Sequence, residues 1–327
     1  MEVEAAIIKL PKNDTAVLDW APDGKQFATG HSNGQVKLYE NEEQVALLEG
    51  HKKAVTSIAW SPDGRAFATA GHDNRVLLWR DGTLLADLGG HKRPVYELGW
   101  SSDSELLASC SGDGNLIIWH EVEKAATLIG HEKAVTSLSW SPDGDSLASG
   151  SADATVRVWD RDGNLVSVLK GHNDAMARVA WSPDGGSKLL ASSSYDNTAR
   201  LWRNSEEVAV MTGHKDRVFG LGWRPDGEIL ATGGGFKDAM VKLWKSDGNE
   251  MANLTGHRSS VYQIKWRPDG SMFASSSFDK SVRLWNLEKE LAVLKGHSGP
   301  ALGIKWSPNG KTLASTGTGT IALWHVP

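Results

Sequence analysis

The sequence predicts an all-β fold built from eight copies of one four-stranded unit, closed into a ring. The first observation is a series of tryptophans spaced 40 to 43 residues apart over the 327 residues: Trp20, Trp60, Trp100, Trp140, Trp181, Trp223, Trp266 and Trp306. The second is an aromatic series about nineteen residues later: Tyr39, Trp79, Trp119, Trp159, Trp202, Trp244, Trp285 and Trp324. The third is a recurring Gly-His dipeptide: His51, His91, His131, His172, His214, His257 and His297. Three series in phase indicate a repeat whose period is one supersecondary unit.

Each unit contains four short strand signals, which the second unit shows in order. Residues 54–60 (AVTSIAW) are apolar and alternating, as expected of a first strand. Residues 61–64 (SPDG) predict a turn, because proline presets φ at one corner and glycine accepts a positive φ at the exit. A second strand at 67–70, a third at 75–79 and a weaker fourth at 84–88 complete the unit. Both faces of the inner strands are apolar, so neighbouring units must cover both.

A four-stranded unit of this period with Gly-His and a closing Trp resembles the WD40 repeat family. The resemblance covers the whole chain and implies an eight-bladed β-propeller, with four antiparallel strands in each blade around a central channel. We expect one domain over residues 1–327, with blades at approximately 14–50, 54–90, 94–130, 134–170, 174–213, 216–256, 259–296 and 299–327.

The two ends of the chain indicate how the ring closes. The last unit stops after its third strand, and residues 4–10 (EAAIIKL) match the fourth strand of another unit at 124–129 (KAATLI). We therefore expect residues 4–10 to be the outer strand of the last blade. Such closure pairs strand edges that would otherwise promote aggregation.

Composition and charge narrow the class of protein. The formal net charge of −5 argues against a non-specific nucleic-acid surface, which needs clustered lysine and arginine. The lone Cys110 excludes an internal disulfide and a Cys-based zinc site. The N-terminus lacks the basic segment of a secretory signal, and no run of about eighteen apolar residues could span a membrane. We expect a monomer inside the cell, in the cytoplasm or nucleus, and not a secreted or membrane protein.

A histidine, a serine or threonine, an aspartate and a tryptophan recur together in six units. A hydrolase triad occurs once per site, so six copies indicate architecture rather than catalysis. The WD40 resemblance implies a structural tetrad that links these side chains by hydrogen bonds, and a satisfied buried network of this kind specifies a fold. The six sets are His51/Thr69/Asp73/Trp79, His91/Ser109/Asp113/Trp119, His131/Ser149/Asp153/Trp159, His172/Ser192/Asp196/Trp202, His214/Thr232/Asp238/Trp244 and His257/Ser275/Asp279/Trp285. We expect no catalysis, no cofactor and no metal site.

The tetrad pattern fails in the first and the last unit. The first unit has Pro11, Asn33 and Tyr39 in place of the histidine, the aspartate and the tryptophan. The last unit keeps His297 but has Thr318 at the aspartate position. These two units flank the closure, so we expect them to be the least rigid part of the ring.

Two glycine-rich segments and four further histidines are interpreted as structural or solvated. Residues 30–34 (GHSNG) match G-x-S-x-G but lie between two strands, without the helix that a nucleophile elbow needs, so a hairpin is expected. Residues 233–235 (GGG) lack the Gly-Lys-Ser/Thr of a phosphate loop and predict a small insertion in a corner of the sixth blade. The histidines outside the Gly-His series are expected at solvated corners and strand ends: His31, His72, His120 and His325.

The candidate binding surface is the face that carries the Gly-His loops, where partners of WD40 propellers commonly dock. The positions that should point there lie four and six residues before each first-strand tryptophan, and directly before each corner aspartate. Small residues fill them in the second and fourth units, whereas later units offer aromatic and basic side chains, which are typical of binding hot spots. The candidate partner-binding residues are Tyr96, Tyr195, Arg217, Phe219, Lys237, Tyr262, Phe278 and Leu302, with Arg217 and Lys237 favouring acidic or phosphorylated groups.

The leading hypothesis is a protein–protein interaction scaffold that binds a peptide or loop of its partner on this face. One alternative is a consensus-like or engineered propeller without an evolved ligand, because the units are so alike. Nucleic-acid binding is a further alternative, which the acidic charge disfavours. A propeller enzyme with a cofactor on its axis is the last; it would resemble this chain in blade number only.

Overall fold

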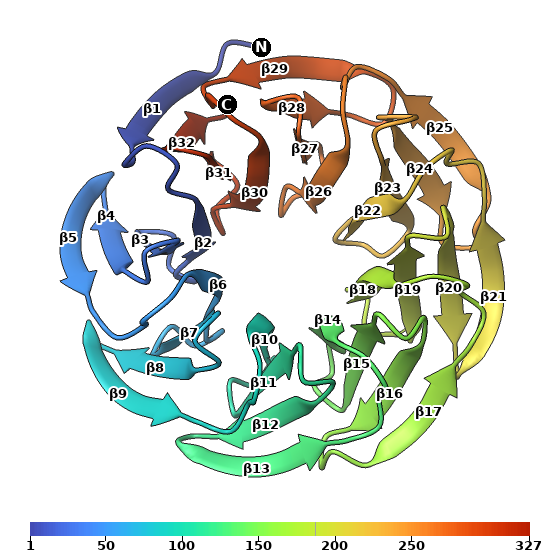
Figure 1. The fold of residues 1–327 in the computed structure, drawn as a ribbon. Coiled ribbons are helices and arrows are strands. Elements are labelled where there is room, and N and C mark those ends of the chain that lie inside the picture. Colours follow the sequence, from blue (N-terminus) through green and yellow to red (C-terminus); the bar gives the residue numbers. More distant parts are fainter. Residues whose placement is uncertain (187) are drawn as a thin grey trace. The chain divides into compact units, whose positions relative to one another are not determined.

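The computed structural model describes residues 1–186 and 188–327, and every regular element within them is a β-strand. The strands form eight antiparallel sheets of four strands each (Figure 1). The chain therefore folds as an eight-bladed propeller, and the predicted fold class is confirmed. It divides into two compact parts, lobe 1 (Met1–Thr15 with His172–Pro327) and lobe 2 (Ala16–Gly171).

Lobe 2 holds blades 1 to 4, and each of its sheets is a meander in chain order. Its strands are β2 (Ala16–Trp20), β3 (Gln26–His31), β4 (Val36–Glu40), β5 (Glu43–Leu48), β6 (Val55–Trp60), β7 (Phe67–Gly71), β8 (Val76–Arg80), β9 (Thr83–Leu88), β10 (Val95–Trp100), β11 (Leu106–Ser111), β12 (Leu116–His120), β13 (Glu123–Leu128), β14 (Val135–Trp140), β15 (Ser146–Ser151), β16 (Val156–Asp160) and β17 (Leu165–Leu169). The first strands β2, β6, β10 and β14 are neighbours, and Figure 1 shows the fourth strands on the outer side of the lobe.

Lobe 1 holds blades 5 to 8. Its strands are β18 (Met176–Trp181), β19 (Leu189–Ser194), β20 (Ala199–Arg203), β21 (Glu206–Met211), β22 (Val218–Trp223), β23 (Ile229–Gly234), β24 (Val241–Lys245), β25 (Glu250–Leu254), β26 (Val261–Trp266), β27 (Phe273–Ser277), β28 (Ser281–Trp285), β29 (Glu290–Lys295), β30 (Ala301–Trp306), β31 (Thr312–Gly317), β32 (Thr320–His325) and β1 (Glu4–Lys9). The first strands β18, β22, β26 and β30 are again neighbours (Figure 1).

The last blade is completed by the N-terminal strand. β1 pairs antiparallel with β32, from Glu4 opposite His325 to Lys9 opposite Thr320. The sheet order is β1-β32-β31-β30, so β1 is the fourth strand that the C-terminal segment lacks. The predicted closure is confirmed, with β1 covering the edge of β32.

Local turn chemistry defines each blade, as blade 2 illustrates. Gly64 takes φ 74° at the exit of the Pro-Asp-Gly turn, and Asn74 takes φ 68° in the corner between β7 and β8. Asp81 and Gly82 both have positive φ, which a two-residue hairpin between β8 and β9 requires.

Because the strands are antiparallel, Gly-His loops and β7–β8-type corners share one end of every blade, which we call the loop end. Pro-Asp-Gly turns and β8–β9-type hairpins share the other, the turn end.

Neighbouring blades within a lobe are joined by apolar packing and by the first-strand tryptophans. A core cluster that includes Ala68, Leu78 and Leu107 is shared by blades 2 and 3. The indole N–H of Trp100 donates to the carbonyl oxygen of Ala59 in the preceding blade at 3.0 Å. The equivalent bond recurs for Trp140, Trp223, Trp266 and Trp306. The tryptophan period found in the sequence therefore marks a repeated link between blades.

Candidate functional site

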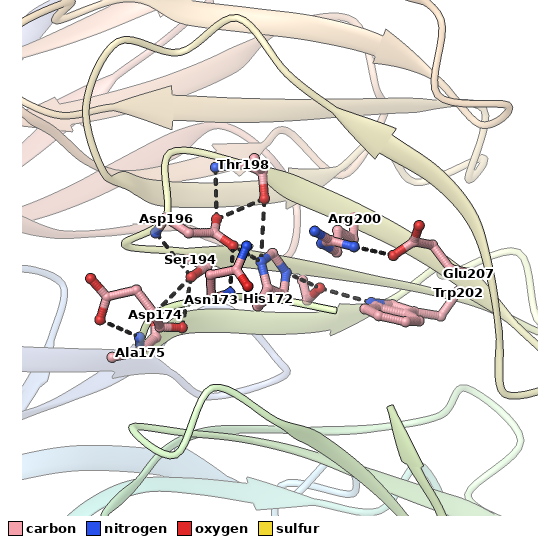
Figure 2. Close-up of polar contacts among 11 residues, drawn as sticks. His172, Asn173, Asp174, Ala175, Ser194, Asp196, Thr198, Arg200, Trp202 and Glu207 are labelled. Carbon is pink, nitrogen blue, oxygen red and sulfur yellow. Dashed lines mark hydrogen bonds and ion pairs between the residues drawn. The ribbon is translucent and has the colours of Figure 1, made fainter. Parts of the chain in front are cut away.

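A buried hydrogen-bonded network occupies each regular blade, and Figure 2 shows the one in blade 5. The Nδ1–H of His172 donates to Asp196 at 2.8 Å, and Nε2 of the same ring accepts from the Ser192 hydroxyl at 2.9 Å. The indole N–H of Trp202 donates to the same hydroxyl oxygen at 2.8 Å. Asp196 also accepts the backbone N–H of Asn173 at 3.0 Å. The network therefore ties the Gly-His loop to the second and third strands.

The fold brings together all six sets that the sequence singles out. In each of them, histidine Nδ1 lies 2.7 to 3.1 Å from an aspartate carboxylate. The histidine side chains of these sets are at most 1% exposed. The six pairs are His51–Asp73, His91–Asp113, His131–Asp153, His172–Asp196, His214–Asp238 and His257–Asp279.

The central member of each network is a buried hydroxyl. Its oxygen lies 2.7 to 3.1 Å from both the histidine Nε2 and the indole nitrogen of the same blade. The residues that supply it are 0% exposed, so they lie out of reach of a partner protein. They are Thr69, Ser109, Ser149, Ser192, Thr232 and Ser275.

Blade 6 departs from the other blades in how its aspartate is held. Oδ2 of Asp238 accepts from His214 at 2.7 Å and from the backbone N–H of Lys215 at 3.0 Å. In blade 5, the second carboxylate oxygen accepts the backbone N–H of Thr198, two residues further on. Oδ1 of Asp238 is buried and has no hydrogen-bond partner among the described residues. The sequence treats this set as equivalent to the other five, but the insertion in its corner leaves one carboxylate oxygen unpaired.

The protonation of the network supports an architectural role. Burial alone would oppose ionisation of Asp196, yet hydrogen bonds from His172, Thr198 and the Asn173 backbone hold its pKa well below the usual range. Burial lowers the pKa of His257, while the carboxylate of Asp279 acts in the opposite direction. Both ring nitrogens of each histidine are already paired, so the network leaves no ring nitrogen for a substrate or a metal.

Blade 8 replaces the aspartate differently from the sequence expectation. The Nδ1 of His297 lies 2.6 Å from the hydroxyl of Thr320, and its Nε2 lies 2.7 Å from that of Ser315. Thr318 is the residue that the sequence places at the aspartate position. The β31–β32 corner is one residue shorter than in other blades, which removes the aspartate and brings Thr320 to Nδ1. Burial without a neighbouring carboxylate lowers the pKa of His297 to about 4.

Blade 1 keeps an imidazole in its network, although not from the Gly-His position. The sequence predicts a solvated His31, but this expectation is wrong: its side chain is fully buried, with Nε2 2.9 Å from the hydroxyl of Thr29. The equivalent position in blade 2 is Gly71, where an added Cβ would lie 2.8 Å from His51 Nδ1. A side chain at this position therefore points into the space that the Gly-His histidine fills in other blades and that Pro11 leaves open in blade 1. The side chain of His31 is buried because it occupies this space.

The remaining sequence expectations for histidines and glycine loops concern surface elements. His72, His120 and His325 are exposed. Residues 30–34 form the β3–β4 hairpin, where Gly34 takes φ 88° and donates its N–H to the His31 carbonyl. Residues 233 and 234 end β23, and residue 235 begins the corner that precedes β24.

Four predicted binding residues form a continuous chain of ring contacts in lobe 1, which we call the aromatic arc: Tyr195, Phe219, Tyr262 and Phe278. Ring centroids are 5.5 Å apart for Tyr195 and Phe219, 6.3 Å for Phe219 and Tyr262, and 5.8 Å for Tyr262 and Phe278. The first and last of these pairs are edge-to-face, a favourable geometry for aromatic rings. The arc lies at the loop end and runs over blades 5, 6 and 7.

The exposure of these side chains leaves part of the arc open to a partner. Phe278 is 44% exposed, and the other three rings are half-buried against one another. Leu302 in β30 is half-buried as well. Tyr96 is 38% exposed but belongs to lobe 2, where it covers Gly112. The structure thus joins four of the six apolar candidates directly.

Two guanidinium groups lie over rings of the arc. The Arg217 guanidinium carbon is 4.8 Å from the Tyr195 ring centroid, and that of Arg178 is 5.8 Å from the Tyr262 centroid. Sequence reasoning named Arg217 but missed Arg178, because the position three residues before the first-strand tryptophan was not among those considered.

The corner of blade 6 holds a second residue that the sequence analysis missed. Phe236 is 71% exposed, more than Phe278 or Tyr96, and the insertion predicted at 233–235 is the signal that could have found it. Lys237 is exposed beside it, and its backbone N–H donates to Asp216 at 3.2 Å. The backbone N–H groups of Arg217 and Lys237 both donate to the Asp216 carboxylate and hold its pKa below the usual range, so a negative charge lies next to these two residues.

The WD domain, G-beta repeat model of the WD40 family matches the chain eight times. The matched residues are 12–40, 42–80, 82–120, 123–160, 163–203, 205–245, 248–286 and 288–325. The chain belongs to the WD40 family. A search of the curated proteins finds no match.

Membership of the WD40 family fits the site described above. WD40 propellers commonly serve as protein-interaction scaffolds, are typically non-catalytic and generally bind protein partners. From the second onward, each WD40 match begins near the fourth strand of one blade and ends with the third strand of the next, which is the phase that lets β1 complete blade 8. Among the described residues, no helix could cross a membrane and no group of three His, Cys, Asp or Glu side chains could hold a metal ion.

Proposed function

We propose that this WD40 propeller is a protein-interaction scaffold that holds a peptide or loop of a partner protein on the aromatic arc, without catalysis. The observation that carries the proposal is the unbroken set of ring contacts from Tyr195 to Phe278 at the loop end. Thr56 and Thr136 occupy the positions equivalent to Phe219 and Tyr262 in blades 2 and 4, so the fold itself does not require rings at those positions. A contiguous apolar surface of this kind typically marks an interface.

The other sequence candidates extend the proposed surface. Arg217 and Lys237 would border the arc with positive charge, and Leu302 would extend it into blade 8. Tyr96 would supply a separate aromatic contact from lobe 2. We also propose that the protein acts as a monomer inside the cell, in the cytoplasm or nucleus; its single cysteine, Cys110, is buried and unpaired, as suits a reducing compartment.

The test is the double substitution of Phe219→Ala and Tyr262→Ala. Burying two rings of this size against a ligand stabilises a complex by roughly 1.5–3 kcal/mol each, so their loss should abolish selection of peptides from a displayed random library. Circular dichroism and Tm should stay close to those of the wild type, because both rings are partly open to solvent.

Two outcomes would contradict the proposal. If the double variant selects the same peptides as the wild type, the interface lies elsewhere on the molecule. If the double variant unfolds, the rings are part of the core. Ala54→Ser in blade 2, at a loop-end position that holds a small residue, is a control that should leave selection unchanged.

A further inference from the structure

We propose that the aromatic arc binds a peptide segment that carries an anionic oxygen group, a carboxylate or a phosphate, next to an apolar side chain, and that it rejects basic segments. This inference rests on the proposed function and adds the chemistry of the partner. It assigns the anion to a pair of guanidinium groups, Arg178 and Arg217, rather than to the exposed lysines of the loop end.

The two guanidinium groups lie over two tyrosine rings that contact the same phenylalanine. The Arg217 guanidinium lies over Tyr195, that of Arg178 lies over Tyr262, and Phe219 contacts both of these tyrosine rings. Arg178 comes from β18 in blade 5, whereas Tyr262 lies two blades further along. Blade 6 lies between blades 5 and 7, and its residue at the position equivalent to Arg178 is Gly220. Blade 6 therefore has no side chain at this position that could separate Arg178 from Tyr262.

The electrostatics of Tyr195 indicate that these groups converge. Burial raises the pKa of Tyr195 and the nearby Tyr262 phenol raises it further, while Arg217 and Arg178 both act to lower it. A single phenol therefore senses both guanidinium groups and the second phenol. Two carboxylates lie near these groups, and each already accepts backbone N–H groups: Asp174 from the next residue at 2.7 Å (Figure 2), and Asp216 from Arg217 at 2.9 Å and Lys237 at 3.2 Å.

This arrangement favours anions over cations for two reasons. A guanidinium held over a ring is partly oriented by that contact, and its planar group can bind a carboxylate or phosphate through two parallel hydrogen bonds. A lysine or methylated lysine would need an open aromatic face. The faces of Tyr195 and Tyr262 already carry Arg217 and Arg178, so a basic ligand would meet positive charge instead.

The direct test uses synthetic peptides of one length that share a central Leu-Phe pair. Four versions flank this pair with aspartate, phosphoserine, serine or lysine, and binding to the full chain is measured by fluorescence anisotropy. We expect the aspartate and phosphoserine peptides to bind at least about tenfold more tightly than the serine peptide, and the lysine peptide not to bind. The ratio of the first two peptides distinguishes a carboxylate from a phosphate as the preferred group.

The matched variants separate oriented guanidinium groups from general positive charge. Arg178→Gln with Arg217→Gln should reduce the preference for the acidic peptides to less than about twofold over the serine peptide. Lys215→Gln with Arg258→Gln removes the same charge from exposed side chains of neighbouring Gly-His loops and should keep the preference. Arg217→Lys keeps the charge but removes the planar group, so it should weaken binding to the acidic peptides about as much as Arg217→Gln does.

The outcomes distinguish this inference from the proposed function. If the serine peptide binds as tightly as the acidic ones and binding still needs Phe219 and Tyr262, the arc is an apolar site and the anion assignment is wrong. If the lysine peptide binds most tightly, the assignment is also wrong. If both double variants lose the preference for the acidic peptides to the same extent, the preference comes from general positive charge and the assignment to Arg178 and Arg217 is wrong. No binding of any peptide at about 1 mM would overturn the inference and the proposed function together.

Discussion

At the scale of single residues, the available hydrogen-bond partner decides where a histidine lies. His131 is a Gly-His histidine held by Asp153 and Ser149, whereas His31 comes from the second strand of its blade and still contacts a threonine hydroxyl. His72 occupies a corner and is exposed. A buried hydroxyl that must pair with an imidazole explains His31, since leaving a buried polar group without a partner costs free energy.

The regular tetrad makes a direct prediction about stability. His131→Ala leaves Asp153 and Ser149 without their partner, so the free energy of unfolding should fall by about 1–3 kcal/mol. His72→Ala is the control, because its side chain is exposed and its loss should change the free energy by less than about 0.5 kcal/mol. Urea denaturation monitored by tryptophan fluorescence measures both. Equal stability of the two variants would contradict a structural role for the tetrad.

The buried His297 in blade 8 should make the free energy of unfolding depend on pH. Its folded pKa of about 4 lies below the 6.5 of an unperturbed histidine, so the unfolded chain takes up the proton first as the pH falls. The stability that neutral His297 contributes is therefore present above about pH 6.5 and lost between there and about pH 4. The loss is on the order of 3 kcal/mol, from about 1.4 kcal/mol per pKa unit.

Comparison with a variant isolates this effect from the other buried histidines. His297→Gln removes the titrating group, so its free energy of unfolding should fall less than that of the wild type between pH 7 and pH 4. Urea denaturation at several pH values gives both profiles. Parallel profiles for the two proteins would show that His297 does not titrate in this range.

At the scale of strands and blades, spacing depends on glycine at one repeat position. Gly222 and Gly99 both directly precede a first-strand tryptophan. A Cβ at Gly222 would lie 2.8 Å from the backbone oxygen of Ile264 in the next blade. A Cβ at Gly99 would lie 2.7 Å from Leu138 Cδ1, the mobile end of a side chain. The two contacts are equally short, but only the first opposes fixed backbone.

This difference predicts that replacing glycine by alanine destabilises the protein more at Gly222 than at Gly99. Gly222→Ala should reduce the free energy of unfolding by about 1–3 kcal/mol, because blades 6 and 7 must move apart. Gly99→Ala should cost less than about 1 kcal/mol, because Leu138 can change rotamer and alanine restricts the unfolded chain. Thermal unfolding of the two variants decides. A larger loss of stability in Gly99→Ala than in Gly222→Ala would contradict the view that contact with fixed backbone limits how closely neighbouring blades pack.

The strands were predictable because their signals are local, whereas part of the site was not. Pro-Asp-Gly turns and alternating apolar residues lie within each unit, and residues 4–10 were placed beside the last strand because their pattern matches a fourth strand. The contact between Phe219 and Tyr262 follows from equivalent positions in successive repeats, and Tyr195 and Phe278 share a second repeat position, directly before the corner aspartate. Arg178 was not predictable in this way, since its contact crosses a blade and depends on the absence of a side chain there.

At the scale of the whole molecule, positive and negative side chains are segregated between the two ends of the blades. In lobe 2 the exposed bases of the Gly-His loops are Lys52, Lys53, Lys92, Arg93, Lys133 and Lys170, and the exposed acids of these loops are Glu49 and Glu132. Exposed acids of the turn end include Asp23, Asp63, Asp81, Asp103, Glu121 and Asp143. The net charge of −5 therefore describes neither end, and a partner meets a different potential at each.

This segregation predicts chromatographic behaviour that the net charge does not. At pH 7 and low salt we expect a sulfonate cation exchanger to retain the protein, because its loop end can face the resin alone. Lys92→Gln with Arg93→Gln should lower the salt concentration of elution. Arg65→Gln with Arg80→Gln removes the same charge from the acidic turn end and should change elution little. If the wild type flows through, or if both double variants shift equally, the charges act as an average and the loop end has no basic surface of its own.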